Sequence, residues 1–273
     1  MRKLKSPIAL LLGLVLAVTA GVSAATTASA AGKPVSVPPG AGDVRPLGVA
    51  FDPGSGRLVQ GYAIVHRKKN ARGGGQARQG KIQCYGFLAK NAKWKTVEPW
   101  VVNPGNTSGL TDAFVASNLA ADIAKWEDAA DGAVGSGPGV NILGGGTTTS
   151  NPLAVDNAAP DNVNEVYFAA IDEPGAIAVT TVWGIFGGPT FQRELVEWDQ
   201  VYDDADYGWS DSGAAGKMDF ENIATHELGH SVGLGDLYNS ACASETMYGY
   251  AGFGETQKRD LNTGDITGAN KLY

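Results

Sequence analysis

One short segment, residues 226–236 (HELGHSVGLGD), constrains this chain more than any other part of the sequence. Histidines four positions apart on a helix differ by about 40° in direction and about 6 Å in rise, so both imidazoles can reach one metal ion. Glu227 follows the first histidine, and its carboxylate is expected beside the metal, where a bound water would sit. Gly233 can end the helix and turn the chain back, which brings Asp236 to a third ligand position. Two imidazoles, one carboxylate and an open fourth position are typical of a catalytic zinc centre.

The small number of histidines sharpens this prediction. The chain has 3 histidines, and the one outside the motif, His66, lies in the N-terminal region beside a basic stretch. A three-histidine site would need that distant residue, whereas Asp236 is local. We therefore predict a metal site formed by His226, His230 and Asp236. The alternative third ligand is Glu255, which lies 25 residues beyond His230.

The N-terminus has the pattern of an export signal. Basic residues at positions 2, 3 and 5 precede an apolar stretch at 8–18, which is followed by small residues in an A-x-A pattern. The apolar run is shorter than the roughly 20 residues that a membrane span needs. We predict that residues 1–30 are a signal peptide and that the protein is secreted, with no stable membrane anchor after cleavage.

The charge of the chain argues against nucleic acid as its main partner. The formal net charge is -7, from 21 Lys+Arg and 28 Asp+Glu. The one strongly basic stretch, residues 66–81, is rich in glycine and lacks the interleaved aromatic residues that nucleic-acid binding favours. It is interpreted as a solvated loop or linker and as a plausible place for proteolytic nicking.

Two cysteines are present, Cys84 and Cys242. An even number in an exported chain suggests one disulfide. Two unrelated buried thiols are the alternative. A third interpretation is that Cys84 ligates the zinc and silences a precursor.

Hydrophobic patterns between the turn-forming clusters predict a compact α+β arrangement. Thr111 and Asp219 are predicted N-caps of two helices, the second of which carries the histidines. Strands are expected at residues 58–66, 99–103, 139–143, 165–171, 176–183 and 195–202, and helices at 111–130, 219–232 and 261–272.

The motifs of the C-terminal region resemble a known family. Residues 226–236 match the long metzincin signature HExxHxxGxx(H/D), whose last position is more often histidine. Residues 244–250 (SETMYGY) resemble the methionine turn of that clan, and residues 265–273 are similar to the last helix of matrixin-like proteases. The resemblance is in motifs over 219–273 and only in element order over 94–218.

This resemblance implies a zinc metalloendopeptidase that acts on proteins and peptides. In such enzymes the glutamate is the general base, which here is Glu227. The three motif side chains, His226, His230 and Asp236, would hold Zn²⁺, and Met247 would form the turn beneath it.

The resemblance also implies a fold and a domain organisation. The expected fold is α+β, with a twisted mixed sheet packed on a long helix and an active-site helix, and with a closing C-terminal helix. We expect the catalytic domain at 84–273, a leader or propeptide with the basic linker at 31–83, and a monomer. An extended substrate is expected to pair along an edge of the sheet at residues 176–183.

The chain departs from the family pattern in two respects. Aspartate in place of the third histidine adds negative charge and should make the zinc a weaker Lewis acid. The cysteine-switch motif PRCG is absent, and Cys84 lies instead in IQCYG. This favours a disulfide with Cys242 over latency through Cys84.

Matrixins usually bind structural Ca²⁺ as well. An acidic run suits such a hard cation, although a solvated acidic loop is the other interpretation. The run contains Asp199, Asp203, Asp204 and Asp206.

Two further functions compete with this one. A thermolysin-like protease would use Glu255 as the third ligand, but the turn at Met247 and the nearby C-terminus disfavour it. A non-catalytic extracellular module could keep a metal without turnover. The presence of Glu227 argues against that module, because a purely structural site needs no base.

Overall fold

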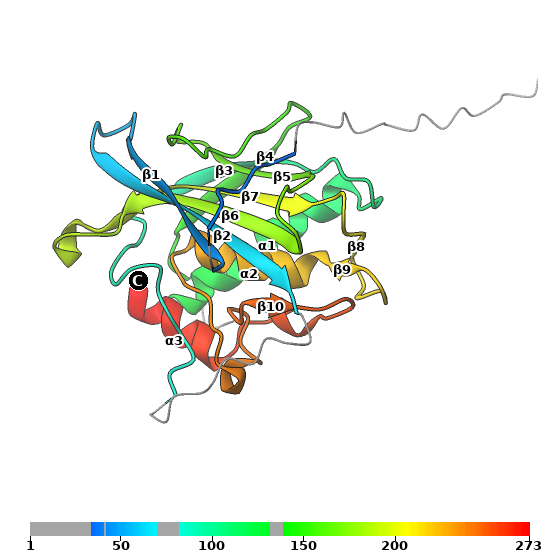
Figure 1. The fold of residues 1–273 in the computed structure, drawn as a ribbon. Helices are drawn as coiled ribbons and strands as arrows, with labels where there is room; N and C mark the ends of the chain where they lie inside the picture. The colour runs from blue at the N-terminus through cyan, green and yellow to red at the C-terminus, as the bar shows by residue number, and fades with distance from the viewer. Residues whose placement is uncertain (1–33, 41, 70–81, 132–138) are drawn as a thin grey trace, which may run out of the picture.

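The computed structural model describes residues 34–40, 42–69, 82–131 and 139–273 (Figure 1). The predicted signal peptide and residues 70–81 of the basic stretch lie outside these ranges. Among the helices in these ranges, none has the length and apolar character needed to cross a bilayer.

A mixed eight-stranded sheet forms the centre of the molecule. Its order is β1-β2-β6-β7-β5-β3-β4, and a short strand, β10, pairs with β2. The strands β7, β5, β3 and β4 run parallel, whereas β6, β2 and β1 continue the sheet in antiparallel pairs. The strands are β1 (Val44–Phe51), β2 (Leu58–Lys68), β3 (Glu98–Asn103), β4 (Leu143–Thr148), β5 (Asn164–Ala169), β6 (Ala176–Ile185), β7 (Glu194–Asp203) and β10 (Tyr250–Ala251), with β8 (Trp209–Ser210) and β9 (Met218–Asp219) in a separate pair.

Three α-helices complete the fold of the described residues, and each begins after an N-cap residue. Figure 1 shows α1 (Asp112–Ala129) and α2 (Phe220–Ser231) on the same side of the sheet. The Thr111 hydroxyl caps α1, and the Asp219 carboxylate accepts a hydrogen bond from the first turn of α2. The closing helix, α3 (Thr263–Leu272), starts with a capping box. The predicted helices, their N-caps and the α+β class are confirmed.

The main core lies between the sheet and these helices. Trp126 of α1 is fully buried, and its indole donates a hydrogen bond to the carbonyl of Thr225 in α2 at 2.8 Å. Trp198 and Tyr202 of β7 face the same core, which fixes α2 against the sheet. A smaller apolar cluster covers the opposite face of the sheet and includes Val65 of β2. Burial on both faces fits the nearly continuous apolar sequence of β6.

The strand predicted at 139–143 is wrong in position, because β4 begins only at Leu143. The N–H groups of Ile142 and Leu143 donate instead to the carboxylate of Glu127 in α1, at 2.6 and 2.9 Å. The strand then runs through glycines. A Cβ at Gly146 would lie 2.2 Å from the Trp100 ring, so this part of the edge needs glycine for close packing.

Residues 176–183, which were expected at a sheet edge, do not form an edge in this structure. In the intact chain β6 is an interior strand, because β2 pairs with it antiparallel from Gln60–Gly184 to Arg67–Ala176. The sheet therefore includes β1 and β2, which precede the expected domain boundary at residue 84, together with the strands that follow this boundary. The sequence pattern showed β2 as a strand but gave no information on its partner.

Candidate metal centre

The helix α2 presents both motif histidines on one face. The rings of His226 and His230 are fully buried, with centroids 4.9 Å apart. The helix ends at Ser231, and Gly233 follows with φ of +104°, a conformation that favours glycine. A Cβ there would also lie 2.9 Å from the carbonyl oxygen of Ala92. This turn carries the chain back to Asp236.

Three potential ligand atoms converge after this turn. Oδ1 of Asp236 lies 3.2 Å from Nε2 of His226 and 3.5 Å from Nε2 of His230. All three atoms lie within 4.8 Å of one another, are buried, and have no hydrogen-bond partner in the described part of the chain. Buried polar atoms are normally satisfied, so three such atoms around one point fit a metal ion. The set of two imidazoles and one carboxylate suits zinc.

The outer nitrogens of both imidazoles are held by backbone carbonyls. Nδ1 of His226 lies 2.7 Å from the oxygen of Thr246, and Nδ1 of His230 lies 2.9 Å from the oxygen of Leu234. An N–H at Nδ1 leaves the Nε2 lone pair free to face a metal. Burial lowers the pKa of His226 to about 4, which keeps this imidazole neutral. Burial acts to raise the pKa of Asp236, but the two histidines outweigh it and hold that pKa well below its usual value.

Glu227 lies beside the ligand group and is held at both oxygens. Its Oε2 accepts a hydrogen bond from the Thr180 hydroxyl of β6 at 2.5 Å, and its Oε1 lies 2.9 Å from Nδ1 of His66. The side chain is fully buried, and this burial raises its pKa to about 7. A carboxylate with a pKa near neutrality suits a general base.

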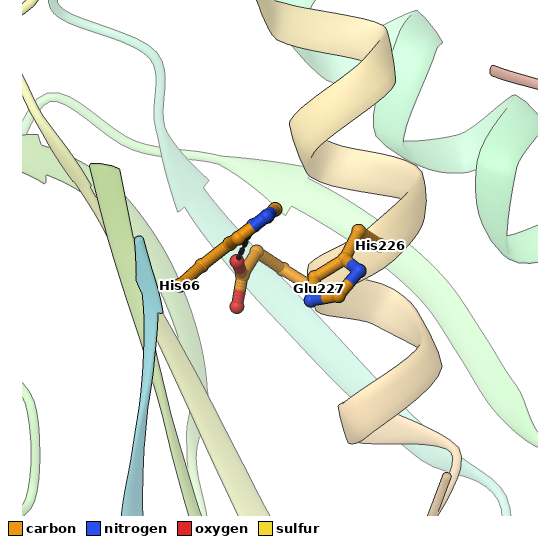
Figure 2. A group of neighbouring side chains, drawn as sticks. All are labelled: His66, His226 and Glu227. Carbon is orange, nitrogen blue, oxygen red and sulfur yellow. Dashed lines mark hydrogen bonds and ion pairs between the residues drawn. The ribbon is translucent and has the colours of Figure 1, made fainter. Parts of the chain in front are cut away.

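His66 is the site residue that sequence reasoning missed. It reaches from β2 toward α2, as Figure 2 shows, and its ring stacks on His226 with centroids 3.9 Å apart. Its Nε2 lies 3.4 Å from Nζ of Lys258, a fully buried lysine whose pKa burial lowers to about 8. Alternation along the strand puts His66 on the same face as Ile64. The pairing register of β2 on β6 then brings this face of the strand next to His226 and Glu227.

Met247 lies beneath α2, where the predicted turn is formed. The N–H groups of Thr246 and Met247 donate to the Asp265 carboxylate at 2.7 and 3.1 Å, which fixes the turn to α3. A Cβ at Gly229 would lie 2.2 Å from Sδ of Met247. The turn and the helix are thus in close contact, and the glycine inside the HELGH motif permits it.

Cys84 and Cys242 form a disulfide, as predicted. The bond joins the start of the expected catalytic region to the segment between Asp236 and Met247. Because Cys84 is bonded to Cys242, the interpretation of Cys84 as a zinc ligand is wrong for this structure.

Glu255 does not take part in the ligand group. Its Oε2 accepts a hydrogen bond from the N–H of Gly252 at 2.8 Å, and its Oε1 accepts one from Gln257 at 3.0 Å. The structure groups Asp236 with the histidines, so the thermolysin-like alternative loses its third ligand.

The acidic run, interpreted either as a calcium site or as a solvated loop, does not form one cluster. Asp203 accepts from the N–H groups of Ala205 and Asp206, and Asp204 accepts from Thr107. Asp199 belongs to a different group of carboxylates. This three-carboxylate group consists of Asp156, Glu197 and Asp199, whose oxygens lie within 4.8 Å of one another.

Comparison with known proteins agrees with this geometry. Residues 169–273 match the family model of the matrixin peptidases. Matrilysin from Homo sapiens is 41% identical over 70 residues, and matrilysin from Rattus norvegicus is 40% identical over 70 residues. Each match covers 26% of this chain and 25% of the relative, so the chain spans about a quarter of the length of these relatives. The C-terminal part of the chain, residues 169–273, is thus similar to the matrixin peptidases of the metzincin clan.

Proposed function

We propose that this protein is a secreted zinc-dependent endopeptidase. His226, His230 and Asp236 would hold the ion through Nε2, Nε2 and Oδ1. The observation that carries the proposal is the convergence of these three buried atoms, each without a hydrogen-bond partner in the described chain, beside the carboxylate of Glu227. The similarity to matrilysin supports the same class of reaction.

Bound zinc supplies a Lewis acid that polarises the scissile carbonyl and activates water. Glu227 accepts the proton of the attacking water and then delivers it to the leaving amine, for which a pKa of about 7 is well suited. Thr180 fixes the orientation of Glu227 through its hydroxyl. The carbonyls of Thr246 and Leu234 fix both imidazoles. Asp236 adds a negative charge where most relatives in the clan have a neutral ligand.

The remaining expectations follow from this proposal. The substrates are proteins and peptides outside the cell. The signal-like N-terminus and the Cys84–Cys242 bond both support secretion, since disulfides persist in oxidising compartments. We retain the expectation of a monomer without nucleic-acid partners.

A structural Ca²⁺ belongs, in this proposal, at the three-carboxylate group, which includes Asp199 but none of the other three residues of the acidic run. Oε1 of Glu197 and Oδ2 of Asp156 are buried without a hydrogen-bond partner in the described chain. Burial, followed by the charge of Asp199, raises the pKa of Glu197 to about 10. A hard cation would reduce the repulsion between these buried carboxylates. A proton retained on one of them would reduce this repulsion as well and is the alternative to a bound cation.

The experiment that tests the proposed function measures metal and turnover in one preparation. The exported protein should contain about one zinc per chain and, in its active form, should cleave casein in a manner that a chelator abolishes. A non-catalytic module would bind zinc equally well but cleave nothing in any form. A protein without zinc would contradict both.

A further inference from the structure

The candidate centre is closed to solvent in this structure. The side chains of His226, Glu227 and His230 are 0% exposed, and that of Asp236 is 4% exposed. A peptide bond within a protein substrate cannot reach Glu227 while these side chains are covered. Another part of the molecule therefore covers these side chains.

The covering element is the β1–β2 hairpin, residues 44–68. An extended peptide binds a sheet by backbone pairing along an exposed edge. Without the hairpin, β6 would be that edge, and its Thr180 contacts Glu227. In the structure β2 pairs with β6 on both sides of this point, since Ile64 lies opposite Thr180. The strand β2 thus occupies the backbone position that a substrate strand would take.

The side chain of His66 fills the reactive position itself. Its Nδ1 is hydrogen-bonded to Glu227 (Figure 2). Its ring stacks on His226, and its Nε2 lies 3.4 Å from Nζ of Lys258. The imidazole therefore stands where the general base would need to meet water and a scissile carbonyl.

Polar contacts fasten the hairpin at the end nearest the site. Arg67 of β2 pairs with Asp43 at 2.7 Å and with Glu173. The Tyr238 hydroxyl lies 2.9 Å from Oδ2 of Asp43 and 3.1 Å from Oδ2 of Asp236. The segment that leads into the hairpin is thereby connected to the third predicted ligand.

We propose that the β1–β2 hairpin is an inhibitory segment that occupies the substrate edge of β6, with His66 inserted against the general base. The hairpin must leave β6 before a polypeptide can be cleaved. This inference rests on the proposed peptidase function and adds its regulation. It also differs from latency through a cysteine, because Cys84 is in a disulfide.

The test uses the full chain and substitutions that weaken the hold of β2 on β6 without changing Glu227 or the predicted metal ligands. Casein hydrolysis and the rate of zinc loss to EDTA are measured for the parent and for each variant. If the open form is a small fraction of the parent protein, both rates should rise by about tenfold in the variants.

Equal casein rates for the parent and the variants would overturn the inference while leaving the peptidase function intact. If no form cleaves casein, the proposed function fails, and zinc loss alone decides about the hairpin. Faster zinc loss from the variants then supports occupation of the site, and equal loss overturns it.

Two substitutions are chosen, and the sign of their effect is the result that matters. His66→Ala removes the contact with Glu227, and Gly61→Ala places a methyl group 2.7 Å from the Trp183 ring of β6. Both should increase casein hydrolysis by weakening the hold of β2. Leu58→Ala, at an exposed position of the same strand, is the matched control and should change little. A lower rate for His66→Ala would instead make His66 part of the catalytic machinery and contradict the inference.

Discussion

The two regions that meet at the metal centre are built in different ways. Residues 219–273 form the centre from local pieces: a capped helix, a glycine turn and a methionine turn fixed to the last helix. The β1–β2 hairpin reaches the same centre only through its register on β6, across 161 residues of sequence between His66 and Glu227. In the proposed account, the first region supplies the chemistry and the second controls access to it.

The largest effect should come from the general base. Glu227→Ala should reduce casein hydrolysis about 10²–10⁴-fold while zinc per chain stays at its original value, because Glu227 acts on water and not on the metal. Steady-state rates and metal analysis of the same samples check this. Glu255→Ala is the matched carboxylate control and should retain activity. A rate for Glu227→Ala within about tenfold of the parent would contradict its role as base.

A large effect on stability should come from the disulfide. Cys84→Ser opens a loop with a sequence separation of 158 residues, for which chain entropy gives about 5 kcal/mol before any strain is subtracted. Denaturant unfolding should show this loss, and zinc retention should fall with it, since Cys242 lies on the segment between Asp236 and Met247. Unchanged unfolding would show that this tether contributes little to the region that builds the centre.

A selective effect on metal binding should distinguish the two carboxylates proposed as third ligand. Asp236→Ala should lower zinc affinity sharply, because it removes one of three ligands, whereas Glu255→Ala should leave it unchanged. Titration with a competing chelator measures both. The reverse pattern would make Glu255 the ligand and overturn the metzincin arrangement of the site.

The smallest effect should come from the three-carboxylate group, away from both regions. The pKa of Glu197 is raised from 4.5 to about 10 by burial, so the folded state holds a proton that the unfolded state loses. Without calcium, the contribution of Glu197 to the free energy of unfolding should therefore be largest below pH 4.5 and fall as the pH rises toward 10. Glu197→Gln should flatten this fall in thermal unfolding. Added Ca²⁺ should raise the thermal stability of the parent at high pH but not that of the variant. An equal increase in both proteins would contradict the proposed calcium site.

The extent of successful prediction follows the same division. The caps at Thr111 and Asp219, the turn at Gly233 and the grouping of the motif side chains all depend on residues close in sequence, and they could be read there. The start of β4 could not be predicted in this way, because the amides of Ile142 and Leu143 donate hydrogen bonds to the side chain of Glu127 on the preceding helix, and the strand pattern does not show this contact. The interior position of β6 could not be read either, since its apolar sequence is equally consistent with an edge covered by substrate.

His66 shows the limit most clearly. The strand predicted at 58–66 includes His66, but a strand prediction does not give the neighbour of either strand face. A one-residue change of register would turn His66 away from Glu227 altogether. Sequence spacing therefore identifies ligands that lie on one helix and its following turn, whereas a residue brought in by strand pairing requires the structure.

The position of the bound metal tests the account most directly. Crystals of the zinc-loaded protein, measured at the zinc absorption edge, should give an anomalous peak about 2.0–2.2 Å from Nε2 of His226, Nε2 of His230 and Oδ1 of Asp236. Glu227 should lie beside the peak without coordinating it. A peak coordinated by Glu255, or one confined to the group of Asp156, Glu197 and Asp199, would contradict the account.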